Sequence, residues 1–167
     1  MILTTDRLLV REWRDADREP FHELCSDAEV MRLVGDGEPW SRERSDAFVA
    51  GNQETFARLG LCQWAVELRE TGELAGFCGF VPNGEWTEMG WRLARRCHGR
   101  GLGTEVAAAV LDDGINRLKL SRIFLTVQAG NRASLRLAEK TGFELGAVFL
   151  RWGRATIRCE LPGGRTV

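Results

Sequence analysis

The spacing of hydrophobic residues predicts a run of strands in the middle of the chain. Trp64, Val66 and Leu68 alternate with smaller or more polar neighbours, the pattern of a half-buried strand. The turn-forming stretch 70–73 leads into a second apolar run over 74–81, and the turn at 82–84 leads into a third over 87–93. Short turns join neighbouring antiparallel strands, so we expect three antiparallel strands here.

Helical spacing dominates the flanking segments. Ahead of the three strands, the pattern predicts a strand over 8–13, a helix after the cap residues 15–17, a short helix over 27–33, a break at 35–39 and a helix from 41 to 59. After them it predicts a helix beyond Gly103, a strand over 122–127, a helix from Asn131 to 141–142, and a hairpin of 143–151 with 155–161.

The order of these elements predicts the fold class. A crossover helix joins the strand at 87–93 to the strand at 122–127, so we expect this pair to be parallel. The remaining neighbours are joined by turns and favour antiparallel pairing. Residues 1–167 are therefore expected to form a single α+β domain, with helices packed on a mixed sheet.

Composition narrows the classes of function. The chain is 44% hydrophobic and 28% charged, as in ordinary soluble proteins, and its net charge of −1 gives no general attraction for nucleic acid or anionic membranes. Asp6 and Arg7 interrupt the region where a secretory signal would be apolar, so we expect a cytoplasmic protein. The five cysteines include no C-x-x-C pair, which argues against a disulfide framework and a metal site.

Three alternate glycines, Gly99, Gly101 and Gly103, precede the central helix. Glycines allow backbone N–H groups to face a ligand, and a helix N-terminus attracts anions. Arg95, Arg96 and Arg100 add positive charge. A dinucleotide fingerprint does not fit, because no G-x-G-x-x-G follows the first strand, and no Gly-Lys-Ser/Thr of a Walker loop occurs. A phosphate cradle and a loop shaped only for packing remain open.

Two segments together resemble the Gcn5-related N-acetyltransferase (GNAT) superfamily. His98-Gly99-Arg100-Gly101-Leu102-Gly103 is similar to its acetyl-CoA signature, with histidine where the family prefers arginine or glutamine. The segment from Asn131 to Gly142-Phe143 resembles a second motif of the family. The stretches 4–11 and 88–91 look like the RimJ/RimL-like branch, which acetylates ribosomal-protein N-termini.

The resemblance implies a binding mode for acetyl-CoA as co-substrate, with no metal. Strands 88–93 and 123–127 would splay around the pantetheine arm, with backbone groups of Leu93 and Arg95 paired to it. Residues His98 to Thr104, among them Arg100 and Leu102, would hold the pyrophosphate. Asn131 would bond the pantetheine and Ser134 would lie near the thioester, although a helix cap and its third helical residue explain both equally well.

The resemblance also implies direct acetyl transfer to a primary amine. Glu88 is the first choice for the base, against an ordinary solvent-facing carboxylate; Glu85 and His22 are further candidates. The chain has no tyrosine, the acid in much of the family, so Ser134, water or, more remotely, Cys97 would protonate the leaving thiolate.

The acceptor is expected to be a protein N-terminal α-amine or a small-molecule amine. Residues 35–40 and the hairpin near Trp152 would supply substrate loops, and Trp40, Trp86 and Trp152 could line a pocket. The alternative function is a non-catalytic acetyl-CoA sensor. Homodimers are common among similar proteins, and the sequence leaves the oligomeric state open.

Overall fold

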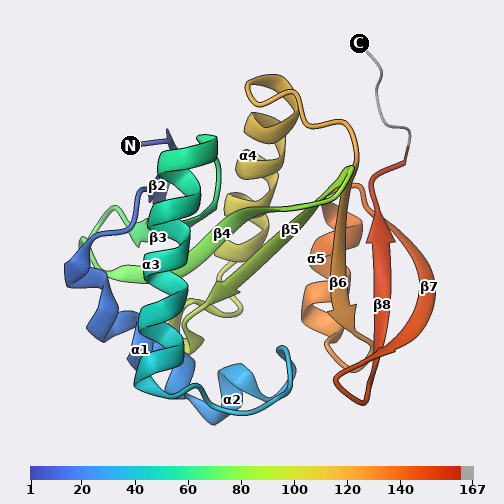
Figure 1. The fold of residues 1–167 in the computed structure, drawn as a ribbon, viewed down its shortest axis with the longest axis horizontal. Helices are drawn as coiled ribbons and strands as arrows, with labels where there is room; N and C mark the ends of the chain where they lie inside the picture. The colour runs from blue at the N-terminus through green and yellow to red at the C-terminus, as the bar shows by residue number, and fades with distance from the viewer. Residues whose placement is uncertain (163–167) are drawn as a thin grey trace.

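One eight-stranded sheet organises residues 1–162, the part of the chain that the computed structural model describes. The strand order is β1-β2-β3-β4-β5-β6-β8-β7, and only β5 and β6 are parallel neighbours (Figure 1). The strands are β1 (Leu3–Thr4), β2 (Leu8–Arg11), β3 (Gln63–Leu68), β4 (Leu74–Asn83), β5 (Trp86–Leu93), β6 (Ile123–Gln128), β7 (Glu144–Arg151) and β8 (Arg154–Glu160). The sequence-based prediction of an α+β mixed sheet is confirmed.

Helices cover both faces of this sheet. The helices are α1 (Arg18–Ser26), α2 (Ala28–Met31), α3 (Arg42–Leu59), α4 (Leu102–Asn116) and α5 (Arg132–Lys140), with 3-10 turns at Asp15–Asp17 and Arg95–Cys97. Phe77 of β4 packs on Phe21 of α1 and Phe48 of α3, with ring centroids 6.2 and 4.9 Å apart. On the opposite face, Phe80 of β4 lies directly against Gly114 of α4.

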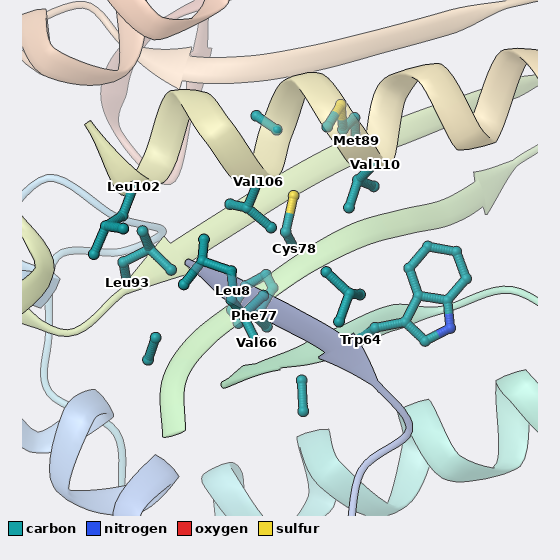
Figure 2. Packing of buried hydrophobic residues seen from close by; sticks show 14 of the residues in the cluster. Leu8, Trp64, Val66, Phe77, Cys78, Met89, Leu93, Leu102, Val106 and Val110 are labelled. Carbon is teal, nitrogen blue, oxygen red and sulfur yellow. The ribbon is translucent and has the colours of Figure 1, made fainter. Parts of the chain in front are cut away.

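The apolar stripe of α4 explains why this helix lies on the sheet. Figure 2 shows Leu102, Val106 and Val110 directed from α4 toward Cys78 and Leu93 of the sheet. All five side chains are at most 7% exposed. Burial of this stripe fixes the N-terminus of α4, and with it the glycine loop, beside the end of β5.

The predicted elements appear in the predicted order, with small differences at their ends. The predicted strand at 8–13 ends at Arg11, and the short helix predicted over 27–33 ends at Met31. Strand β1 was not predicted, because its two residues are too few to show a period; it pairs with β2 through Leu3 and Val10. Among residues 1–162, no helix is long and apolar enough to cross a membrane.

The parallel pair β5 and β6 separates after two residues. The pair is in register only at Thr87 with Ile123 and Glu88 with Phe124. Beyond Glu88, β5 continues along β4 as far as Leu93, while β6 continues along β8 as far as Gln128. The two strands then diverge (Figure 1), so within residues 1–162 the facing edges of both have no strand partner.

Candidate active site

The glycine loop presents free backbone donors at the start of α4. Gly99 and Gly101 have φ of +71° and +76°, a left-handed conformation that side chains disfavour. Leu102, Gly103 and Thr104 form the first turn of α4, and their N–H groups have no partner among the described backbone carbonyls. Together with the helix dipole, these donors form a site suited to phosphate oxygens.

A hydrogen-bonded clamp from the N-terminal segment holds this loop. Glu105 of α4 accepts hydrogen bonds from Thr5 Oγ1 (2.6 Å), Arg7 Nε (2.7 Å) and the Arg7 backbone N–H (3.0 Å). Arg7 Nη1 also donates to the Arg100 carbonyl oxygen, 2.8 Å away. Burial acts to raise the pKa of Glu105, but the bonds from Thr5 and Arg7 outweigh it and lower that pKa.

His98 turns back onto the end of β5. Its Nε2 lies 2.8 Å from the Leu93 carbonyl oxygen. A carbonyl only accepts, so Nε2 carries the proton in this contact. The histidine at the position where the family motif prefers arginine or glutamine therefore donates a hydrogen bond to the end of β5.

A cavity lies between the glycine loop, the end of β5 and α5. We call it the loop cavity; among the predicted cofactor residues it is lined by Leu93, His98, Gly99, Gly101, Gly103, Thr104, Asn131 and Ser134. Arg92, Arg136 and Lys140 also line it, and no acidic side chain of the described residues does. A cationic, glycine-rich cavity suits a phosphorylated ligand.

Three predicted cofactor residues lie outside the lining of the loop cavity. Arg95, like Arg96, lines a different hollow, and Arg96 Nη2 donates to the Leu74 carbonyl oxygen at 2.7 Å. Leu102 is buried in the core, and the carbonyl of Arg100 receives the bond from Arg7. The positive charge that lines the cavity comes instead from Arg92 of β5 and from Arg136 and Lys140 of α5, which no spacing in the sequence had connected with the loop.

Asn131 and Ser134 have the geometry of a helix cap. Asn131 Oδ1 accepts a hydrogen bond from the Ser134 backbone N–H at 3.1 Å, and Asn131 Nδ2 lies 3.4 Å from the Leu33 carbonyl oxygen. The Ser134 hydroxyl has no hydrogen-bond partner within residues 1–162, and both residues line the loop cavity. Capping therefore accompanies their position at the cavity and does not replace it.

A second cavity lies on the sheet face covered by α1 and α3. We call it the tryptophan cavity; Gly35, Trp40, Glu88 and Trp152 all line it. Both predicted substrate segments thus reach one cavity, whereas Trp86 packs on Phe124, with ring centroids 6.2 Å apart. The two cavities share Val34, Trp91, Arg92, Asn131 and Ser134. They therefore meet at the split between β5 and β6.

Glu88 stands where that split begins. Its Oε1 accepts hydrogen bonds from Thr126 Oγ1 (2.6 Å) and Arg151 Nη1 (3.1 Å). Glu88 Oε2 has no partner among the described residues. The carboxylate is thus fixed through one oxygen and open at the other.

The other candidate acids and bases lie elsewhere. The Glu85 side chain is 82% exposed and pairs with Arg122, and the His22 ring contacts Ser45 Oγ at 3.1 Å; neither residue lines the two cavities. Cys97 borders the loop cavity but is 1% exposed, and burial raises the pKa of its thiol. These positions favour packing for Cys97 and leave Glu88 as the carboxylate of the tryptophan cavity.

Residues 7–144 match the family model described as the acetyltransferase (GNAT) domain. The chain belongs to this GNAT acetyltransferase family.

Individual proteins agree with this assignment. The chain is 33% identical over 151 residues to the uncharacterized N-acetyltransferase YnaD of Bacillus subtilis, covering 89% of this chain and 86% of that protein. A GNAT-family acetyltransferase structure from Bacillus anthracis is 28% identical, with a TM-score of 0.84 over 96% of this chain and 97% of that one. RimL, a ribosomal-protein α-N-acetyltransferase solved with coenzyme A, shares the fold at 18% identity, with a TM-score of 0.80 over 95% of each chain.

Proposed function

We propose that this protein transfers the acetyl group of acetyl-CoA directly to a primary amine. The observation that carries the proposal is the meeting of two cavities at the strand split. One is cationic and begins at a helix N-terminus, and the other contains Glu88. A thioester held in the first would meet an amine held in the second.

The residues of the loop cavity fit acetyl-CoA. The free N–H groups at the start of α4 would bind the pyrophosphate, with Arg136 and Lys140 as counter-charges. The edge of β5 beyond Glu88 does not pair with β6 and would bind the pantetheine amides as far as Leu93, whose carbonyl also accepts the bond from His98. When bound, the cofactor supplies an acetyl group activated as a thioester.

Glu88 is proposed as the base. Its open Oε2 would take a proton from the acceptor ammonium, directly or through water, which frees the nitrogen lone pair to bond the acetyl carbon as the carbon–sulfur bond breaks. Once the nitrogen is bonded to the acetyl carbon it would lose its second proton, and the Ser134 hydroxyl or a water beside the leaving sulfur would relay that proton to the thiolate. A thiol with a pKa near 8.5 leaves readily as the anion, so the missing tyrosine is tolerated.

The acceptor is proposed to be a protein N-terminal α-amine before a small-molecule amine. Support for this order comes from the RimJ/RimL-like stretches at 4–11 and 88–91. The likeness to RimL concerns the fold alone, so the acceptor must be identified by assay.

Turnover with Glu88→Gln tests the function. Acetyl-CoA is incubated with peptide N-termini and small amines, and release of the CoA thiol is followed. We expect Glu88→Gln to lower kcat at least about a hundredfold, the usual size of a general-base effect, while acetyl-CoA still raises the Tm. Glu85→Gln, with its exposed carboxylate, should stay within about twofold of the original protein.

Two other results would contradict the proposal. Binding of acetyl-CoA with no turnover on either panel would favour the sensor function. Equal rates for Glu88→Gln and the original protein would remove Glu88 from the mechanism.

A cytoplasmic location and a homodimer stay predictions. The exposed apolar side chains of edge strand β7, among them Val148 and Leu150, are the surface to mutate when the oligomeric state is measured by sedimentation.

A further inference from the structure

Arg92 is a buried cation at the junction of the two cavities. Its side chain lies on the same face of β5 as Glu88, and the residue is 7% exposed. The guanidinium carbon is 4.3 Å from the ring centre of Trp40 and 5.5 Å from that of Phe77. Arg92 nevertheless lines both the loop cavity and the tryptophan cavity.

No carboxylate of the described residues forms an ion pair with this guanidinium; Asp36, which is itself paired with Arg44, acts on it only through Coulombic attraction. Arg92 Nη1 donates a hydrogen bond to Cys25 Sγ, 3.2 Å away, and the buried Nε has no partner within residues 1–162. Burial raises the pKa of the Cys25 thiol, so that partner is neutral. Burial also lowers the pKa of Arg92, yet a guanidinium remains protonated in proteins.

A second buried arginine in the same chain shows the usual compensation. Arg11 is 4% exposed, and it pairs with Asp17 and Glu67, each at 2.7 Å. Buried charges are normally paired in this way, because desolvating an unpaired charge is costly. Arg92 departs from this rule at a cavity wall, where a ligand could supply the missing anion.

The other charged side chains that line the tryptophan cavity already form ion pairs. Arg44 pairs with Asp36 at 2.8 Å, and Arg151 pairs with Glu88 at 3.1 Å. Arg92 is therefore the cation of this cavity that has no ion-pair partner among the described residues. On the strand, Arg92 lies four residues from Glu88, about 13 Å between Cα atoms at the usual rise per residue. Both residues line the tryptophan cavity.

We propose that Arg92 binds a carboxylate of the acetyl acceptor, so that the substrate class is amines that carry a carboxylate. This inference rests on the proposed function. The amine would lie near Glu88 and the carboxylate at Arg92, where a guanidinium can offer two parallel N–H donors. Polyamines, which place cations at both ends, would be rejected by the uncompensated charge.

Matched acids and carboxamides test this specificity. The pairs are glycine and glycinamide, β-alanine and β-alaninamide, and the dipeptides Ala-Asp and Ala-Asn with amidated C-termini. With the original protein, we expect at least one acid to have a kcat/KM ten or more times that of its amide. Arg92→Met should abolish this preference by raising the KM of the acid, with the amide within about twofold. Arg92→Lys should keep part of the preference, and Arg58→Met, an exposed control on α3, should change neither.

The outcomes separate this inference from the proposed function. Spermidine is assayed beside these pairs as a polyamine without a carboxylate. Equal turnover of acids and amides, or preferred turnover of spermidine, would overturn the carboxylate site and leave acetyl transfer intact. Loss of the acetyl-CoA-dependent Tm shift in Arg92→Met would assign Arg92 to the cofactor instead. If no amine in the panel is acetylated, the acids and amides are titrated into the CoA-loaded protein by calorimetry. An acid that binds at least tenfold tighter than its amide, with this difference lost in Arg92→Met, supports the carboxylate site. Equal binding overturns it.

Discussion

Removal of the Arg7 side chain should weaken acetyl-CoA binding from outside the cavity. Arg7 contacts Glu105 and the Arg100 carbonyl but does not line the loop cavity. The Arg7 side chain is 49% exposed, so its ion pair is worth about 0.2–1 kcal/mol, and the bond to the carbonyl adds about 1 kcal/mol. Arg7→Ala should therefore lower the free energy of unfolding by about 1–2 kcal/mol.

The same energy sets an upper limit on the loss of affinity. A change in loop population cannot alter binding by more than the free energy that held the loop. Arg7→Ala should thus raise the Kd for acetyl-CoA at most about 5–30-fold. The Tm of the free protein should fall roughly 2–8 °C, at about 2–4 °C per kcal/mol for a chain of this size.

Calorimetric titration with acetyl-CoA measures this effect against a matched control. Arg14 is also exposed and has one carboxylate partner, Glu67 at 3.6 Å, and it does not line the loop cavity. Arg14→Ala should leave the Kd unchanged. If Arg7→Ala weakens binding no more than Arg14→Ala, the clamp does not position the loop.

Further predictions concern stability, pH and the α5 cap. A Cβ on Gly79 would lie 2.1 Å from the Cys62 carbonyl oxygen, so Gly79→Ala should lower the free energy of unfolding in urea by about 3 kcal/mol. Gly51 lies in open space within α3, and Gly51→Ala should raise that free energy by about 1 kcal/mol. Changes of the same sign in both variants would contradict the packing. The pKa of Glu105 is lowered from about 4.5, so its stabilising effect is complete above that pH and is lost as the pH falls through the lower folded value. The Tm difference between the original protein and Glu105→Gln should be constant from pH 7 to 5 and shrink toward pH 3; a constant difference throughout would refute this. Asn131→Ala should cost about 1 kcal/mol through the lost cap and reduce the Tm shift given by acetyl-CoA, and an unchanged Tm would show that the cap is not needed.

The predicted elements were confirmed because local physics controls them. The alternation around Trp64 and the helical stripe that includes Val106 each require one buried face, whatever the rest of the chain does. The helix starts at 41 and at Asn131 could be predicted because a cap acts within three residues; the side chains of Ser41 and Asn131 accept hydrogen bonds from the N–H groups of Arg44 and Ser134. The crossover helix likewise required a parallel pair.

The contacts around the cavities could not be predicted in this way. Thr5 and Arg7 meet Glu105 across about a hundred residues, and Arg151 meets Glu88 across 63. Arg92 reads in the sequence as one polar position of an alternating strand. Only the packing of α1 and α3 on that face buries it beside Trp40. The periodic spacing of hydrophobic residues does not indicate which distant residue packs over a given position.

The sequence by itself determined the helices and strands, their order, the fold class and the glycine loop at the head of α4, because each depends on neighbours within a few residues. Only the tertiary structure decided where β5 and β6 separate, which cations line the loop cavity, how Glu88 is held, and that no carboxylate of residues 1–162 pairs with Arg92. These features arise where segments far apart in the chain come together, and the chemistry of the site depends on them.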